Sequence, residues 1–440
     1  MIQTVAFQTK ARTVDHLGRE QIADTPTAIS ELWKNSYDAY ARGVALDLYD
    51  GPRPIAALTD DGHGMSRAEF ETRWLVVGTE SKAAGGPTPV ADRNGLKLRP
   101  RQGQKGIGRL SCANLGPLLL LLSKRSSEPF VAALVDWRLF ENPFLNLSDI
   151  RIPIVDFTEL PRLFELLPDL RAGLVQNVTG DDPSDDGRAK RLQAAWKAND
   201  ELRRAELDAN GDEGFRLPSQ AILEDVADLG FERRHLSTWS VAAGESDHGT
   251  ALLVAGINYD LLVEIGQVED DSSAEASRRK FFETLTSFVD PFVDPAERGA
   301  AASQLDFDYA VRAWQGNQPR TIVGQEKTFD RRVLDGMEHV LLGSIDVNGV
   351  FRGRVKAFGR WVEGDIVMDP PKDLVIPRRA DSEVGPVGLY IASMEFQAVA
   401  TTLPKQEFER FRELAERYSG FMIFRDGLRV LPYGREDSRG

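Results

Sequence analysis

The sequence predicts an α+β protein with a large first domain and a smaller second one. The chain has 440 residues, which is enough for two domains and a sizeable insertion. Its first part alternates helical segments with apolar, strand-like ones. After about residue 304 the pattern becomes rich in strands, and an amphipathic helix is expected over residues 404–418. We therefore expect a first α/β domain over residues 1–300 and a second over residues 301–440.

Composition narrows the class of protein further. Hydrophobic residues make up 42% of the chain and charged residues 28%, as in a globular protein. The single cysteine, Cys112, excludes a disulfide within the chain and argues against a zinc site. No apolar run approaches the ~18–20 residues of a membrane span, and the N-terminus lacks a signal pattern. We expect a cytoplasmic protein with no membrane association, and its net charge of −14 argues against a broad nucleic-acid surface.

The first polar cluster lies on a predicted helix. Residues 28–41 contain no glycine or proline, and Pro26 suits the first helical position. Glu31, Asn35 and Asp38 are spaced i, i+4 and i+7, so they share one face of this helix. An amide oxygen is a ligand that Mg²⁺ accepts, and a carboxylate one turn earlier can deprotonate a water. The alternative is a solvated polar surface.

The second polar cluster follows a short predicted strand, residues 54–59. Asp60 stands at the strand end, and Gly62 and Gly64 make a tight turn before Met65. A carboxylate in this position can accept a hydrogen bond from a purine amino group. A plain turn is the alternative, because Asp-Gly is common in turns.

The third cluster is a glycine-rich loop over residues 103–111. Gly103, Gly106 and Gly108 leave backbone N–H groups free to face an anion, and a following helix adds its positive end. The mostly apolar residues 110–122 continue as a buried helix and strand would. The loop is not a Walker motif, since no Gly-Lys-Ser/Thr ends it.

In this order and spacing the three clusters resemble the motifs of the GHKL ATPase superfamily, which includes heat-shock chaperones, type II topoisomerases, MutL and MORC proteins, and sensor histidine kinases. The motifs are Glu-x-x-x-Asn-x-x-Asp-Ala, Asp-x-Gly-x-Gly and Gly-x-x-Gly-x-Gly. A fourth signal, a Gly-Thr pair on a late strand, matches Gly249 and Thr250. The resemblance implies a Bergerat-type two-layer α/β sandwich that binds ATP with Mg²⁺.

The resemblance also implies roles for individual residues. Glu31 becomes the general base, Asn35 the magnesium ligand and Asp60 the reader of adenine, with Thr250 bonding near the adenine. The other implied nucleotide contacts are Asp38, Gly62, Gly64, Met65, Thr79, Lys82, Gly103, Gln104, Lys105, Gly106, Ile107, Gly108 and Arg109.

Three further segments are interpreted through the same resemblance. We expect residues 78–111 to form a lid that closes over ATP. We expect residues 160–236 to form a charged helical insertion, either a partner-docking element or a simple decoration. The arm before residue 24 is expected either to cross to a second subunit or to form an edge strand over residues 4–7.

The second domain resembles the transducer domain of these ATPases. Lys405, at the start of a predicted helix, is the candidate cation for the terminal phosphate. The ending over residues 420–434 looks closest to bacterial MORC-like and chaperone-like ATPases. We expect an ATP-hydrolysing switch whose lid closure and dimerisation act on a protein or DNA partner, in antiviral defence or DNA transactions. The alternatives are a histidine-kinase-like phosphotransferase and a nucleotide-binding adaptor that hydrolyses nothing.

Overall fold

The chain divides into two compact units. The computed structural model describes residues 9–19, 22, 24–77, 86–102, 108–181, 185–210, 216–266, 272–286, 288–290, 307–324, 331–371, 385–397, 399–418, 420 and 422–431. The first unit comprises Met1–Thr286 with Leu305–Glu326, and the second comprises Ser287–Gln304 with Lys327–Gly440. Each unit has a mixed α and β composition, which confirms the predicted fold class.

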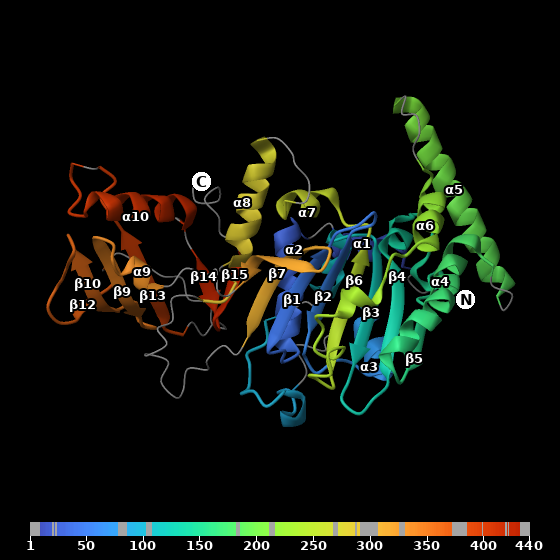
Figure 1. Cartoon of the computed structure of the whole chain (residues 1–440), viewed down its shortest axis with the longest axis horizontal. Coiled ribbons are helices and arrows are strands. Elements are labelled where there is room, and N and C mark those ends of the chain that lie inside the picture. The colour runs from blue at the N-terminus through green and yellow to red at the C-terminus, as the bar shows by residue number, and fades with distance from the viewer. Residues whose placement is uncertain are drawn as a thin grey trace, which may run out of the picture. The chain divides into compact units, whose positions relative to one another are not determined.

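An eight-stranded sheet forms the centre of the first unit (Figure 1). Its strand order is β5-β4-β3-β6-β2-β1-β7-β8. The β1–β7 pair is parallel, and all the other pairs of neighbouring strands in this sheet are antiparallel. The strands are β1 (Gly43–Tyr49), β2 (Ile55–Asp60), β3 (Leu118–Lys124), β4 (Phe130–Asp136), β5 (Ile154–Phe157), β6 (Gly249–Ala255), β7 (Asp308–Gln315) and β8 (Gln318–Gly324).

The helices of this unit differ in what they pack against. Figure 1 shows α4, α5 and α6 gathered beside β4 and β5, with α4 in contact with both strands. At another part of the unit, α8 contacts α2 and α7. The helices are α1 (Arg12–Leu17), α2 (Thr25–Asp38), α3 (Arg67–Glu69), α4 (Leu163–Thr179), α5 (Asp186–Asn210), α6 (Pro218–Ala227), α7 (Tyr259–Glu264) and α8 (Ser272–Thr286).

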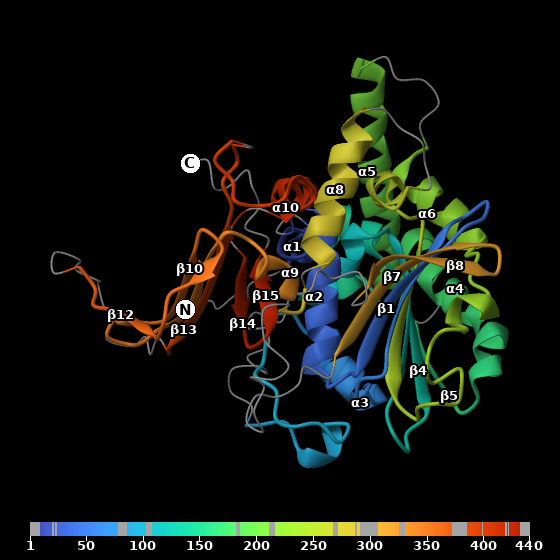
Figure 2. The same cartoon turned by 60° about the vertical axis from the view of Figure 1, so that its left-hand side comes forward.

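Helix α2 forms where the sequence predicts it, because its capping and its burial agree. The Asp24 side chain caps it by accepting a hydrogen bond from the backbone N–H of Thr27, and Pro26 lies in the first turn. Its apolar face is buried, and the Trp33 ring lies 5.1 Å from the Tyr309 ring of β7. Figures 1 and 2 show α2 beside β1 and β7. The opposite, polar face of α2 carries Glu31.

The second unit has a sheet of its own, in the order β11-β10-β9-β13, with β12 paired to β10 (Figure 2). Met337, Met394, Phe408 and Phe411 form a core between this sheet and α10. The remaining elements are α9 (Arg331–Leu334), β9 (His339–Ile345), β10 (Phe351–Ala357), β11 (Arg360–Trp361), β12 (Ile366–Met368), β13 (Val387–Ser393), α10 (Lys405–Tyr418), β14 (Ile423–Arg425) and β15 (Leu428–Leu431).

The extent of the first unit differs from the sequence-based expectation. The boundary expected at residue 300 separates β7 and β8 from the first domain, but both strands extend the first sheet, because β7 pairs with β1. Strand β4 ends at Asp136, whose carboxylate accepts a hydrogen bond from the Arg138 N–H and starts a 3-10 turn. The strand expected over residues 4–7 lies outside the described residues. Among the helices that the structure describes, none is both long and apolar enough to cross a membrane.

Candidate functional site

The polar face of α2 meets the end of the glycine-rich loop. A Cβ atom added to Gly108 would lie 3.3 Å from Asn35 Nδ2 and 3.5 Å from Glu31 Oε2. Glycine therefore lets the backbone come close to both side chains. Glu31 also forms an ion pair with Lys34, one turn further along α2, at 2.8 Å. The Glu31 side chain is 32% exposed, so it remains open to a ligand or a water.

The start of the same loop is also held at α2. The backbone N–H of Gln102 donates to Asp38 Oδ1 at 2.8 Å. The glycine-rich loop therefore begins beside Asp38 and ends beside Asn35, one turn earlier on α2. Gly103, Gln104, Lys105, Gly106 and Ile107 lie outside the described residues, as do Thr79 and Lys82.

Asp60 is buried at the end of β2 and faces α2. Its Oδ2 accepts a hydrogen bond from the Ser36 hydroxyl at 2.8 Å, and its Oδ1 accepts one from the Gly62 N–H at 2.9 Å. Burial raises the pKa of this carboxyl to about 6, against the opposing effect of these two hydrogen bonds. The buried carboxylate is therefore oriented by the protein before any ligand arrives.

Thr250 lies next to Asp60 on the neighbouring strand. The two residues are register partners in the β2–β6 pair, and Thr250 is also the partner of Ser123 in the β3–β6 pair. The hydroxyl oxygens of Ser123 and Thr250 are 3.5 Å apart, and the Met65 N–H donates to the Ser123 hydroxyl at 2.8 Å. Four segments that are distant in the sequence thus meet around the Asp60 carboxylate.

The turn after Asp60 requires glycine for steric reasons. Gly64 has a φ of +63°, and a Cβ there would lie 2.0 Å from the Lys124 carbonyl oxygen. A Cβ at Gly62 would approach the Ala39 Cβ to 2.9 Å. Both glycines let the turn fit closely, Gly62 against the end of α2 and Gly64 against the end of β3.

Arg109 follows the glycine-rich loop and is only partly exposed. Its Nη2 donates to the carbonyl of Val76, while its Nε is shielded from solvent and has no hydrogen-bond partner among the described residues. Burial lowers the pKa of its guanidinium. Lys405, the other cation singled out in the sequence, begins α10 in the second unit.

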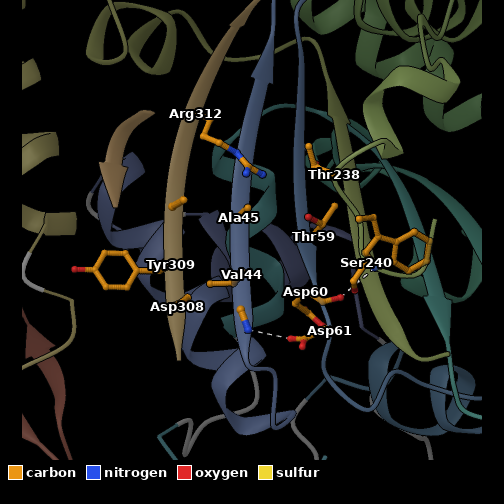
Figure 3. A pocket seen from close by; sticks show the side chains of 13 residues that line it. Val44, Ala45, Thr59, Asp60, Asp61, Thr238, Ser240, Asp308, Tyr309 and Arg312 are labelled. Atoms are coloured by element: carbon orange, nitrogen blue, oxygen red, sulfur yellow. Dashed lines mark hydrogen bonds between the residues drawn. The ribbon is translucent and has the colours of Figure 1, made fainter. Parts of the chain in front are cut away.

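A pocket with a volume of about 300 Å³ lies elsewhere on the sheet (Figure 3). Ala45, Thr59 and Ala310, which are register partners on three neighbouring strands, line it. Thr59 is followed in β2 by Asp60, and Ala310 is preceded in β7 by Tyr309. The side chains of Asp60 and Tyr309 meet α2, on the other face of the sheet. The pocket therefore opens mainly on the sheet face opposite α2. Asp60 is among the residues that line it, but Glu31, Asn35 and Gly108 are not, so we do not assign the pocket to the candidate site.

Sequence reasoning missed several residues of the site. Lys34 and Ser36 flank the predicted residue Asn35 on α2. A hydroxyl inside a helix is a weak indication of a side-chain hydrogen bond, and this indication was present in the local sequence. Ser123 and Gln102 gave no usable signal, since one lies in an apolar strand and the other bonds through its backbone. The contacts of Ser36, Ser123 and Gln102 depend on tertiary packing, whereas the Lys34–Glu31 ion pair is an i,i+3 contact within α2.

A comparison with protein families agrees with the resemblance to the GHKL ATPase superfamily. Residues 24–155 match the family model described as histidine kinase-, DNA gyrase B- and HSP90-like ATPase. The chain therefore carries a domain similar to those of the GHKL ATPase superfamily, and the matched segment holds α2, the Asp60 turn and the glycine-rich loop.

Two further comparisons do not narrow the class of protein further. A crystal structure of the N-terminal domain of a DNA repair protein is similar to this chain with 13% identity and a TM-score of 0.32, over 78% of this chain and 70% of that one. At this TM-score the likeness carries no argument. No curated protein matches the sequence.

Proposed function

We propose that the chain is a magnesium-dependent ATPase that works as a nucleotide-driven switch. The observation that carries this proposal is the convergence on α2 of Glu31, Asn35, Asp60 and Gly108, which come from three separate stretches of the chain. The family match over residues 24–155 supports the same conclusion. The histidine-kinase-like and non-hydrolysing alternatives become outcomes of the experiments below.

Adenine recognition is assigned to the Asp60 carboxylate. It is buried, it lies at the end of a strand, and Ser36 and the Gly62 N–H fix its orientation. As an acceptor it suits the exocyclic amino group of adenine, and Thr250 and Ser123 offer hydroxyl groups beside it. Guanine presents a carbonyl oxygen in place of that amino group, so the site should prefer adenine nucleotides.

Phosphate and metal binding are assigned to the other end of the polar face of α2. Asn35 would hold the Mg²⁺ through its amide oxygen, and the backbone around Gly108 can approach the phosphates because it has no Cβ. When bound, the metal would neutralise charge on the phosphate oxygens. Asp38 contributes by holding the start of the loop through the Gln102 N–H.

Hydrolysis is assigned to Glu31. Its carboxylate lies against Gly108 and remains one-third exposed, so it can orient and deprotonate a water that attacks the terminal phosphate. Lys34 pairs with one oxygen of this carboxylate and leaves the other, Oε2, on the Gly108 side. Lys405 remains our candidate for the cation that the second unit sends to the terminal phosphate.

The switch would consist of lid closure over residues 78–111 and ATP-dependent dimerisation, acting on a protein or a DNA partner. The defence role and the MORC-like subtype rest on the resemblance of the C-terminal residues alone. Solution mass, measured with and without a non-hydrolysable ATP analogue, tests the dimer. An unchanged monomer mass at saturating analogue would contradict this part of the proposal.

The enzymatic part is tested by phosphate release from the purified full-length protein. Wild type should release phosphate from Mg-ATP, and Glu31→Gln should bind ATP with unchanged affinity but release at least about a hundredfold less. Glu206→Gln, on the exposed surface of α5, is the matched control and should behave as wild type. Equal rates in wild type and Glu31→Gln would remove Glu31 from its role. Transfer of labelled phosphate to a histidine would favour the kinase alternative.

A further inference from the structure

The pocket on the sheet face opposite α2 owes its space to small side chains in its floor (Figure 3). One row of the floor consists of Thr59, Ala45 and Ala310, register partners on β2, β1 and β7. In the next row of the same face, the ion pair of Asp47 and Arg312 at 2.6 Å bounds the floor. The hollow of about 300 Å³ that remains has the size of a small-molecule site.

The other end of the pocket is a gap between two carboxylates, which Figure 3 shows at the same end. Gly43 is the register partner of Asp308 in β7, and Asp61 Oδ1 accepts a hydrogen bond from the Gly43 N–H at 2.9 Å. A Cβ atom added to Gly43 would have only the Asp308 carbonyl oxygen within 4 Å, at 4.0 Å. The space above Gly43 is therefore open, with a carboxylate on the strand side of Asp61 and another on that of Asp308.

Within the described part of the chain no cation compensates these two carboxylates. Asp61 accepts hydrogen bonds from two backbone N–H groups, and both are accepted by Oδ1. Asp308 is exposed, and its carboxylate has neither a hydrogen bond nor an ion pair with a described residue. Arg312, the basic residue among those that line the pocket, is paired with the buried Asp47. This end of the pocket is thus negatively charged and attracts a cation.

The rest of the pocket indicates an organic cation. No group of three or more His, Cys, Asp or Glu side chains in the described part of the chain could hold a metal ion. Beyond Gly43 lie the methyl groups of the floor and the hydroxyls of Thr238 and Ser240, and the Ser240 hydroxyl has no hydrogen-bond partner among the described residues. At the far end Arg312 uses Nε and Nη2 for Asp47, which leaves Nη1 to donate to an oxygen atom.

We propose that this pocket binds a small organic ammonium ion, with its ammonium group over Gly43 between Asp61 and Asp308 and a hydroxyl or carbonyl oxygen at the Arg312 end. An ammonium group has three N–H donors and can serve both carboxylates at once. The two ends are four residues apart along a strand, or about 13 Å at the backbone, and the side chains reach inward from both. The pocket lies on the other face of the sheet from the proposed nucleotide site and does not rest on it.

The test follows the methyl NMR signals of Ala45 and Ala310 in the full chain, assigned by their loss in Ala45→Gly and Ala310→Gly. The probes are aminopentanol, with an amine and a hydroxyl at the two ends of five carbons, its uncharged isostere pentanediol, and pentylamine, which lacks the hydroxyl. Aminopentanol should shift both signals. Pentanediol should bind at least about tenfold more weakly, because it loses the charge-assisted hydrogen bonds, and pentylamine about threefold more weakly.

Two variants test the position of the ammonium group. Gly43→Ala should weaken aminopentanol binding by about tenfold or more without lowering the urea midpoint of unfolding, because its Cβ enters the gap but meets no atom nearer than 4.0 Å. Asp308→Asn keeps the shape of the side chain, removes its charge and should weaken binding by about fivefold or more. Gly388→Ala, in β13 of the second unit, also has open space around it and is the control with unchanged affinity.

Several results would overturn the inference. Both methyl signals could stay in place up to about 50 mM aminopentanol. Pentanediol could bind as tightly as aminopentanol, or potassium chloride at the same ionic strength could cause the same shifts. Wild-type affinity in both Gly43→Ala and Asp308→Asn would place the amine elsewhere. None of these measurements contains a nucleotide, so their failure leaves the proposed ATPase function standing.

Discussion

Replacing Asp60 by asparagine should stabilise the protein while abolishing nucleotide binding. The carboxyl has a pKa of about 6 in the folded protein, against an ordinary value of 3.8, and burial is the largest cause. This difference corresponds to about 3 kcal/mol, by which ionised Asp60 disfavours the folded state at neutral pH. Asparagine removes this cost but weakens one of the two hydrogen bonds, at about 1 kcal/mol. The net expectation is a gain of about 1–2 kcal/mol.

The pH dependence gives this prediction a second, independent check. Between pH 3.8 and about 6 the native state holds the Asp60 proton and the unfolded chain does not. Stability contributed by this group therefore falls as the pH rises through that window, and the full cost is present above it. The advantage of Asp60→Asn over wild type should be largest at pH 7.5 and about one-third as large at pH 5, because the cost of ionising Asp60 is about half as large there while the weakened hydrogen bond still costs about 1 kcal/mol.

Urea unfolding followed by tryptophan fluorescence measures this advantage. Of the seven tryptophans only Trp361 lies outside the first unit, so the signal reports mainly on the unit that contains Asp60. Ser36→Ala is the control, because it removes a donor from the same carboxylate and should lower the stability. A variant Asp60→Asn that is less stable than wild type at pH 7.5, or an advantage independent of pH, would refute the reasoning.

Two further substitutions test other parts of the site. Gly64→Ala should lower the free energy of unfolding, measured with urea, by more than about 3 kcal/mol, because its Cβ would lie 2.0 Å from the Lys124 carbonyl oxygen. The control is Gly86→Ala, which has open space around it and should stay within about 0.5 kcal/mol of wild type. Equal effects of the two substitutions would contradict the steric argument. Lys34→Met should lower phosphate release by about tenfold with ATP affinity unchanged, because Glu31 loses the ion pair that orients it, and Lys34→Arg should restore most of the rate. Full activity of Lys34→Met would show that this ion pair is dispensable.

The sequence was most informative where local signals agreed with one another. Helix α2 has a capping residue, a proline in its first turn, an apolar face and a polar face, and all of them give the same prediction. The Asp60 turn was equally accessible, since a strand followed by closely spaced glycines can be recognised without knowing its neighbours.

The parts that could not be predicted depend on contacts between distant residues. Strand β7 pairs in parallel with β1, which joins Gly43 to Asp308 across most of the chain, and no local pattern indicates this partner. A boundary expected at residue 300 places this segment in the second domain, whereas β7 belongs to the first unit. The bond from Ser36 to Asp60 likewise exists only because β2 and α2 pack together.

The arrangement of the site also explains why α2 has to be held so firmly. Its apolar face is fixed to β7 through Trp33 and Tyr309, and its polar face carries the groups that would bind a nucleotide. Because Ser36 and the Gly62 N–H already orient Asp60, binding requires no rearrangement of that carboxylate, and its unfavourable burial is offset when the whole sheet folds. A charge buried at the cost of stability and oriented in advance for its ligand suits a binding site, whereas the buried structural carboxylates of Asp47 and Asp136 are each paired with an arginine. On this argument the instability caused by Asp60 and its proposed ability to select adenine have the same physical origin.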